Sequence, residues 1–226
     1  MTIIMTKPEK YFLAGYMLFE LAVLPWLLQQ LIDLFSLGWS AAALNFLYFL
    51  MNFLAVVTIS GRFLVNSLKC AVKEPEKLLK SWIIWFAVYW VATFAVSTGI
   101  VTFYPDFANV NDASIAEYVD SEPLLMIIGT VFLVPTVEEC LYRGLIFGTL
   151  RSRNRLAAYA LSAALFSLVH VVGYIGVYPL PLLALCLLQY VPAGLCLAQA
   201  YEAADNIFAP ILIHTTVNAI GMIAMR

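Results

Sequence analysis

The sequence predicts an all-α, polytopic membrane protein, a helical bundle of about seven transmembrane helices, or eight if one of them is broken. Of its 226 residues, 63% are hydrophobic and only 12% are charged, whereas soluble domains carry about 25% charged residues. A water-soluble core of this size could not hide so much apolar surface, and the apolar residues gather in long runs. We therefore expect lipid to surround the chain and no nucleic acid to bind it.

Apolar runs define the transmembrane segments, since a spanning helix needs about 20 predominantly apolar residues. The runs are residues 11–32, 41–60, 81–104, 123–149, 156–174, 177–200 and 206–225. The first run is long and lacks a small-residue cleavage site, so we expect a membrane anchor and not a removable signal peptide. The fourth run contains Pro135 and Gly144, at which a helix can kink or break into two spans.

The distribution of positive charge predicts the orientation of these segments. Basic residues occur before the first segment, between the second and third, and after the fourth: Lys7, Lys10, Arg62, Lys69, Lys73, Lys77, Lys80, Arg151, Arg153 and Arg155. The link between the third and fourth segments is acidic instead, and we expect it to be a solvated connector. By the positive-inside rule, the N-terminus is cytoplasmic and the C-terminus lies outside, as in a multi-pass protein of the cell membrane.

The fourth segment contains three charged residues, Glu138, Glu139 and Arg143, within an apolar stretch. Ionisable side chains at membrane depth mark functional sites by default. Glu139 and Arg143 are four residues apart, with the acid first, which favours a buried ion pair on one helix face. Glu138 is rotated by about 100° from Glu139 and shares its face with Tyr142. The pair therefore leaves Glu138 free to act as a general base.

The chain has only two histidines, His170 and His214, and both lie inside apolar segments. Phe166 precedes the first by one helical turn and Asn218 follows the second, so each pair shares a helix face. At about 1.5 Å per residue, Glu138 lies ~16 Å and His170 ~21 Å from the basic links. On the same basis, His214 lies ~12 Å and Asn218 ~18 Å from the link near residue 206. Similar depths on three helices predict one shared polar site, in which Phe166 packs the other side chains.

These residues form three motifs in order: Glu138-Glu-x-x-x-Arg143, Phe166-x-x-x-His170 and His214-x-x-x-Asn218. Together they resemble the CPBP or Abi family, which includes CAAX prenyl endopeptidases of the Ras-converting type and bacterial bacteriocin-processing or self-immunity proteins. The resemblance covers about residues 123–222 and lies within a helical core, residues 123–226, of a single membrane domain. The remaining part, residues 1–122, comprises N-terminal transmembrane helices and the acidic outer loop.

The resemblance implies an intramembrane endopeptidase of the glutamic type in a bacterial plasma membrane, with a peptide or membrane protein as substrate. It implies that Glu138 is the general base and that His170 is its partner on the attacking water. His214 and Asn218 would donate hydrogen bonds to the oxyanion of the tetrahedral intermediate. The reaction would then be peptide-bond hydrolysis with neither a covalent intermediate nor a cofactor.

Other readings of the same residues remain open. Glu138, His170 and His214 could be zinc ligands with a fourth position for water, although no HExxH motif is present. The absence of GxSxG disfavours a serine mechanism. The polar cluster could also belong to a non-catalytic scaffold, an immunity protein or a transporter. In the first segment, we expect Glu20 to make a polar contact between helices rather than to take part in catalysis.

Overall fold

Helices form most of the chain in the computed structural model, which describes residues 3–36 and 38–224 and has no β-strand in them. The first six are α1 (Lys7–Ala22), α2 (Leu24–Phe35), α3 (Ala41–Ile59), α4 (Gly61–Lys73), α5 (Pro75–Phe103) and α6 (Val110–Ser121). One long run follows, made of α7 (Pro123–Ile127), η1 (Ile128–Leu133), α8 (Val134–Glu138), η2 (Glu139–Phe147) and α9 (Gly148–Leu150). The last three are α10 (Arg155–Val172), α11 (Leu180–Ala204) and α12 (Phe208–Ala224).

The structure confirms a polytopic helical bundle and has helices at each of the expected segments. Among the described residues, five helices are long and apolar enough to cross a membrane: α3, α5, the run Pro123–Leu150, α10 and α11. The pair α1 and α2 passes the same test together, with a bend of 48° between them. The apolar helix α12 has only 17 residues, and residue 225, where we expected its segment to end, lies outside the described residues.

The bend between α1 and α2 differs from the single straight helix expected over residues 11–32. Val23 separates the two helices, and Pro25 occupies the first turn of α2. Proline has no N–H and its ring clashes with the carbonyl four residues back, so it is tolerated at the start of a helix but not inside one. The chain therefore ends one helix and begins another at this point.

The fourth segment does not break into two spans at Pro135 or Gly144. It is one helical run that contains two π-helical stretches, η1 and η2. In π-helix each N–H bonds to the carbonyl five residues back, which adds residues to a turn. The stretch η1 ends at Leu133, so that Pro135 falls in the first turn of α8, where its missing N–H does little harm. Gly144 lies inside η2, where a Cβ atom would meet Met5 Cε at 2.6 Å. Gly144 therefore marks a position where the helix packs closely against Met5, and not a break in the helix.

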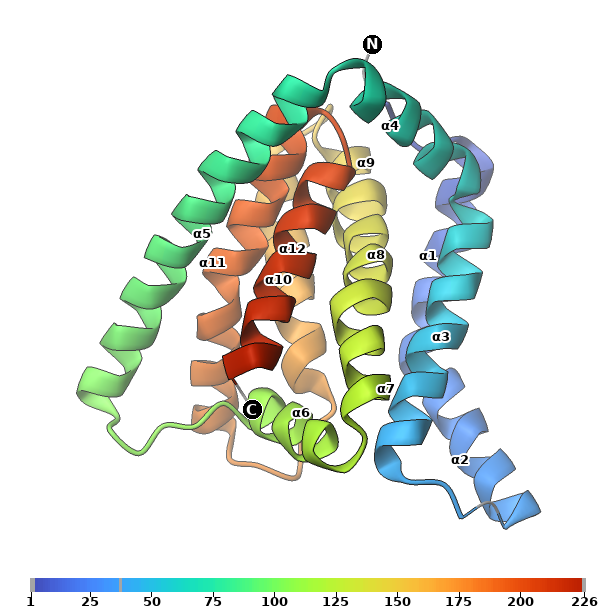
Figure 1. Ribbon diagram of the computed structural model, residues 1–226, viewed down its shortest axis with the longest axis vertical. Helices are drawn as coiled ribbons and strands as arrows, with labels where there is room; N and C mark the ends of the chain where they lie inside the picture. Colours follow the sequence, from blue (N-terminus) through green and yellow to red (C-terminus); the bar gives the residue numbers. More distant parts are fainter. Residues whose placement is uncertain (1–2, 37, 225–226) are drawn as a thin grey trace.

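The two ends of the bundle differ in charge (Figure 1). The N-terminus, the basic helix α4 and the link between α9 and α10 lie at the top of the view, and α6 and the C-terminus lie at the bottom. Helix α4 crosses the top of the bundle between α3 and α5 and buries one face through Phe63, Ser67 and Ala71. Gathering the basic segments at one end is what the positive-inside orientation requires.

The acidic link contains a packed helix, α6, and is not simply the solvated connector expected from its charge. Asn109 caps the helix, because its side-chain oxygen accepts hydrogen bonds from the backbone N–H groups of Asn111 and Asp112 at 3.0 and 3.3 Å. Val110 and Val119 are buried against the rest of the protein. These contacts place α6 across the acidic end of the bundle (Figure 1).

Candidate functional site

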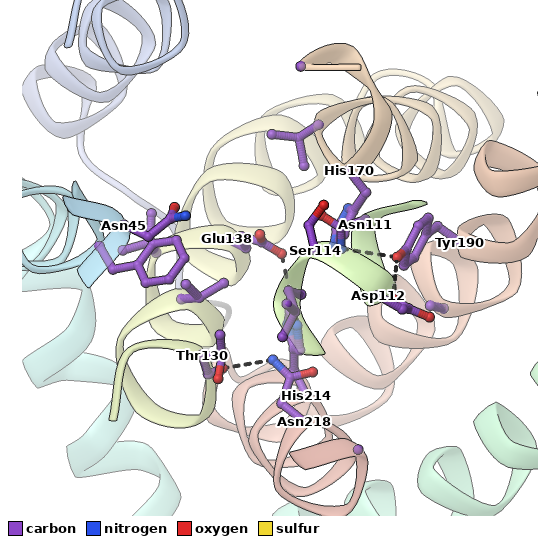
Figure 2. Close-up of a pocket in the computed structure, with 18 of the residues that line it drawn as sticks. Asn45, Asn111, Asp112, Ser114, Thr130, Glu138, His170, Tyr190, His214 and Asn218 are labelled. Carbon is purple, nitrogen blue, oxygen red and sulfur yellow. Dashed lines mark hydrogen bonds and ion pairs between the residues drawn. The ribbon is translucent and has the colours of Figure 1, made fainter. Parts of the chain in front are cut away.

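A cavity of about 630 Å³ inside the bundle is lined by all four residues expected to form the site, Glu138, His170, His214 and Asn218 (Figure 2). Side chains of α1, α3, α5, α6 and α11 complete its lining. The cavity reaches α6 at the acidic end, through Asn111, Asp112 and Ser114. None of its described lining residues comes from α4 or from the basic link before α10.

Beside the cavity, Glu139 and Arg143 form the ion pair predicted from their spacing. Arg143 Nη1 donates to Glu139 Oε1 at 3.0 Å, and both side chains are fully buried. Arg143 Nη2 donates to the backbone carbonyl of Gly194 at 3.0 Å, and the guanidinium lies 4.3 Å from the ring centroid of Phe166. Charge pairing, a hydrogen bond and a cation–π contact together make this buried arginine tolerable. They also tie η2 to α10 and α11.

Close approach of α10 and α11 makes this arrangement possible. A Cβ atom on Gly194 would lie 2.8 Å from Ala163 Cα and 2.9 Å from its Cβ, so only glycine fits at this crossing. Phe166 lies one turn beyond Ala163, with its ring near those of Tyr142 (5.8 Å between centroids), His170 (4.9 Å) and His214 (5.7 Å). Phe166 thus packs between the site residues, as the sequence predicted.

His214 lies between the two adjacent glutamates. Its Nδ1 is 2.8 Å from Glu139 Oε1, and its Nε2 is 3.9 Å from Glu138 Oε2. Glu139 Oε1 also accepts a hydrogen bond from Arg143, so it is the acceptor in the contact with His214, and Nδ1 is the donor. The hydrogen bond fixes the orientation of the ring and turns Nε2 towards Glu138. The resemblance implies His170 as the partner of Glu138 on the water, and the structure adds His214 as a histidine next to Glu138.

Glu138 itself has no local partner on its own helix. Within the described chain, its buried Oε2 atom makes no hydrogen bond, and its side chain is 16% exposed. Tyr142, one turn further on, also lines the cavity, so the two residues share a face as expected. Glu138 is therefore the carboxylate of the adjacent pair that a molecule in the cavity can reach.

His170 is held from the opposite side of the cavity. Its Nδ1 lies 2.7 Å from the carbonyl oxygen of Phe166, and its ring stacks on Tyr190 with centroids 4.1 Å apart. Tyr190 Oη donates to Asp112 Oδ1 at 2.8 Å, a contact drawn in Figure 2. Burial raises the pKa of Asp112 above its ordinary value, while the Tyr190 hydrogen bond and the nearby His170 oppose that rise. Helix α6 thus orients a site residue through α11.

Asn218 owes its position to a proline on another helix. In η1, the amide of Val134 bonds to the carbonyl of Gly129, five residues back. The next amide in that register would reach the carbonyl of Thr130, but the next residue is Pro135, which has no N–H. Asn218 Nδ2 donates to this carbonyl instead, at 2.8 Å (Figure 2). The second N–H of the amide remains available to a ligand.

Two features of the cavity were not assigned to the site from the sequence. Glu20 of α1 lines the cavity with only 4% of its surface exposed, and Asp112 lines it from α6. The depth of Glu20 in the first segment could have suggested this, since it matches that of the other polar residues. Nothing in the local sequence of Asp112 distinguishes it from the other acids of the link.

The geometry does not gather the alternative zinc ligands. In the part of the chain that the structure describes, no three His, Cys, Asp or Glu side chains form a group that could hold a metal ion. Glu138 and His214 are near one another. The His170 ring instead contacts the Phe166 carbonyl through Nδ1 and stacks on Tyr190. We therefore derive no step through a metal.

The fold and the cavity define the class of protein: an apolar helical bundle that encloses a polar site with acids and histidines. Residues 120–220, which contain all three motifs, match the model of the type II CAAX prenyl endopeptidase Rce1-like family. This match confirms the predicted resemblance over this part of the chain.

The chain also resembles a bacterial protein over a longer stretch. It is 28% identical over 163 residues to the UPF0177 protein YxdF of Lactococcus lactis subsp. lactis (strain IL1403), which covers 70% of this chain and 84% of that protein. No solved structure matches the chain.

Proposed function

We propose that this protein hydrolyses a peptide bond of a membrane-associated peptide or protein, using a water molecule activated by Glu138. The observation that carries the proposal is the arrangement of Glu138, His214 and Glu139. A reachable carboxylate faces a histidine nitrogen at 3.9 Å, and a second, buried carboxylate fixes the histidine ring. A base and a hydrogen-bonding group thus flank one point in a cavity within the membrane-spanning bundle.

In the proposed reaction, Glu138 takes a proton from water, and the hydroxide oxygen attacks the carbonyl carbon of the substrate. The resulting oxyanion accepts hydrogen bonds from Asn218 Nδ2 and His214 Nε2. When the C–N bond breaks, the proton held by Glu138 passes to the leaving nitrogen, which departs as an amine. His170, which also lines the cavity, would be the second residue besides Glu138 to form a hydrogen bond with the attacking water. No covalent intermediate forms, and the base is regenerated.

The fixed ring of His214 adds a condition to this mechanism. Because Nδ1–H already donates to Glu139, His214 can donate from Nε2 only when both ring nitrogens carry protons. In that form the ring is positively charged and lies between the carboxylates of Glu138 and Glu139, at 3.9 and 2.8 Å. Preorganised donors of this kind are worth about 3–4 kcal/mol each in the barrier.

The test is cleavage of a fluorogenic peptide library by purified protein in nanodiscs. We expect Glu138→Gln, which keeps the shape but removes the base, to lower kcat by about 10²- to 10⁴-fold. Asp33→Asn is a matched control, since it removes an exposed carboxylate from α2, away from the cavity, and should cleave as wild type does. Activity that survives in Glu138→Gln would refute the proposal.

Adding a tight chelator separates the metal mechanism from the proposed one. Cleavage that is lost on chelation and restored by Zn²⁺ would assign the reaction to zinc. If no peptide is cleaved by wild type or variant, and a cellular immunity function persists in Glu138→Gln, the non-catalytic scaffold is the better description.

A further inference from the structure

The cavity has an uneven charge. Three carboxylate residues line it, Glu20, Asp112 and Glu138, and none of its described lining residues is Lys or Arg. Arg143 does not contribute, because it is fully buried outside the lining and its guanidinium is held by Glu139, Gly194 and Phe166. Carboxyl groups therefore outnumber the two histidines, His170 and His214, among the described lining residues.

Glu20 is the carboxylate that the proposed mechanism does not use. It is 4% exposed, and the hydrogen bond found for it among the described residues reaches its backbone carbonyl and not its carboxylate. Its polar neighbours are engaged elsewhere: Tyr48 Oη donates to the Glu20 backbone carbonyl at 3.3 Å, and Asn52 Oδ1 accepts from Tyr16 at 2.6 Å. Burying a carboxylate without a partner is costly, so a site that keeps one points to a cation that arrives with the ligand.

Glu20 and Glu138 line the same cavity, so the negative charge of either carboxylate would oppose that of the other. A positively charged group between them would relieve this repulsion and would be attracted by both. A negatively charged group would be repelled by both, and none of the described lining residues is Lys or Arg.

We propose that the substrate carries a lysine or arginine side chain close to the scissile bond and that Glu20 binds its cationic group. The inference deepens the proposed function and rests on it. The substrate is thus a segment with a basic residue near the cleaved bond.

Binding can be measured apart from cleavage. The probes are three fluorescent peptides of one apolar sequence with blocked ends, which carry lysine, Nε-acetyl-lysine or glutamate at one scanned position. The acetylated residue keeps the stem of lysine and removes its charge. A fourth peptide, with acetyl-lysine at that position and a free N-terminal amine, tests whether a terminal ammonium can replace the side chain. Wild type, Glu20→Gln, Glu20→Asp and the control Asp33→Asn are compared in nanodiscs.

We expect wild type and Asp33→Asn to bind the lysine peptide about 10- to 100-fold more tightly than the acetyl-lysine peptide, the range for a hydrogen bond to a charged group. Glu20→Gln should abolish this ratio, and Glu20→Asp should retain part of it. Equal binding of both peptides by wild type would overturn the inference, as would a ratio that persists in Glu20→Gln. Preference for the peptide with the free amine would assign the subsite to a terminal ammonium and overturn the lysine assignment.

Cleavage of the same peptides separates this inference from the proposed function. A lysine preference in binding, with no dependence of cleavage on Glu138, would support the subsite and refute the mechanism. Cleavage that requires Glu138 but is equally fast for lysine and acetyl-lysine peptides would do the reverse. Glu20→Asp keeps a carboxylate in the cavity, so loss of binding in both variants with a lowered melting temperature would show that Glu20 acts through folding, contrary to the inference.

Discussion

Removing the charge of Arg143 should destabilise the protein strongly, because it strands Glu139 in the core. Arg143→Met keeps much of the side-chain stem but loses the ion pair at 3.0 Å, the hydrogen bond to Gly194 at 3.0 Å and the contact with Phe166 at 4.3 Å. Breaking a buried pair by removing one partner costs about 3–5 kcal/mol, since the remaining charge is uncompensated. Thermal or denaturant unfolding in detergent measures this loss.

A double-mutant cycle tests whether the charge is the cause. Glu139→Gln combined with Arg143→Met leaves no unpaired charge, so the double variant should be clearly more stable than the sum of the single changes predicts. The control is Arg155→Met, which breaks an exposed pair with Glu202 at 2.7 Å and should change the stability little. Equal losses in Arg143→Met and Arg155→Met, or additive effects in the cycle, would refute the reasoning.

Two further predictions concern the ends of the cavity. Asn218→Leu leaves the Thr130 carbonyl without its donor, which should cost about 1–3 kcal/mol of stability and should also lower kcat. The control variant Thr130→Ala should change neither the stability nor kcat, because this variant retains the backbone carbonyl. Asp112 has a raised pKa in the folded protein, so its folded state binds a proton more readily than its unfolded state. Stability should therefore fall as pH rises from the ordinary carboxyl range towards the raised value. Asp112→Asn should flatten this fall in melting temperature as pH rises above the ordinary carboxyl range, and an unchanged profile would contradict the assignment.

Local spacing predicted those parts of the site that lie on one helix. Glu139 and Arg143 pair because residues four apart share a helix face, and this holds even where the helix becomes π-helical. The apolar runs predicted the helices because lipid imposes a length and a composition on each span. The sequence predicted one fourth segment and left open a break at Pro135 or Gly144, whereas the π-helical stretches within the continuous Pro123–Leu150 helix were not predicted.

Relations between helices could not be read in the same way. Depth counting placed Glu138, His170 and His214 at similar levels, but depth does not tell which helix is next to which. That Glu138 lies beside His214 could therefore not be predicted from depth. The same reason explains Glu20, whose depth was visible from the sequence while the direction of its side chain depends on how α1 packs.

Pro135 has a consequence for how this bundle keeps its shape. The backbone carbonyl groups inside a helix normally accept hydrogen bonds from N–H groups of the same helix. They then make no hydrogen bond that would fix the axial position of a neighbouring helix. Here one carbonyl, that of Thr130, is left over by the proline and is bound by Asn218 of α12. The bond fixes the axial position of the last helix relative to the fourth segment to within the length of a hydrogen bond. His214 lies one turn from Asn218, so the same bond sets the height at which its ring meets the two glutamates.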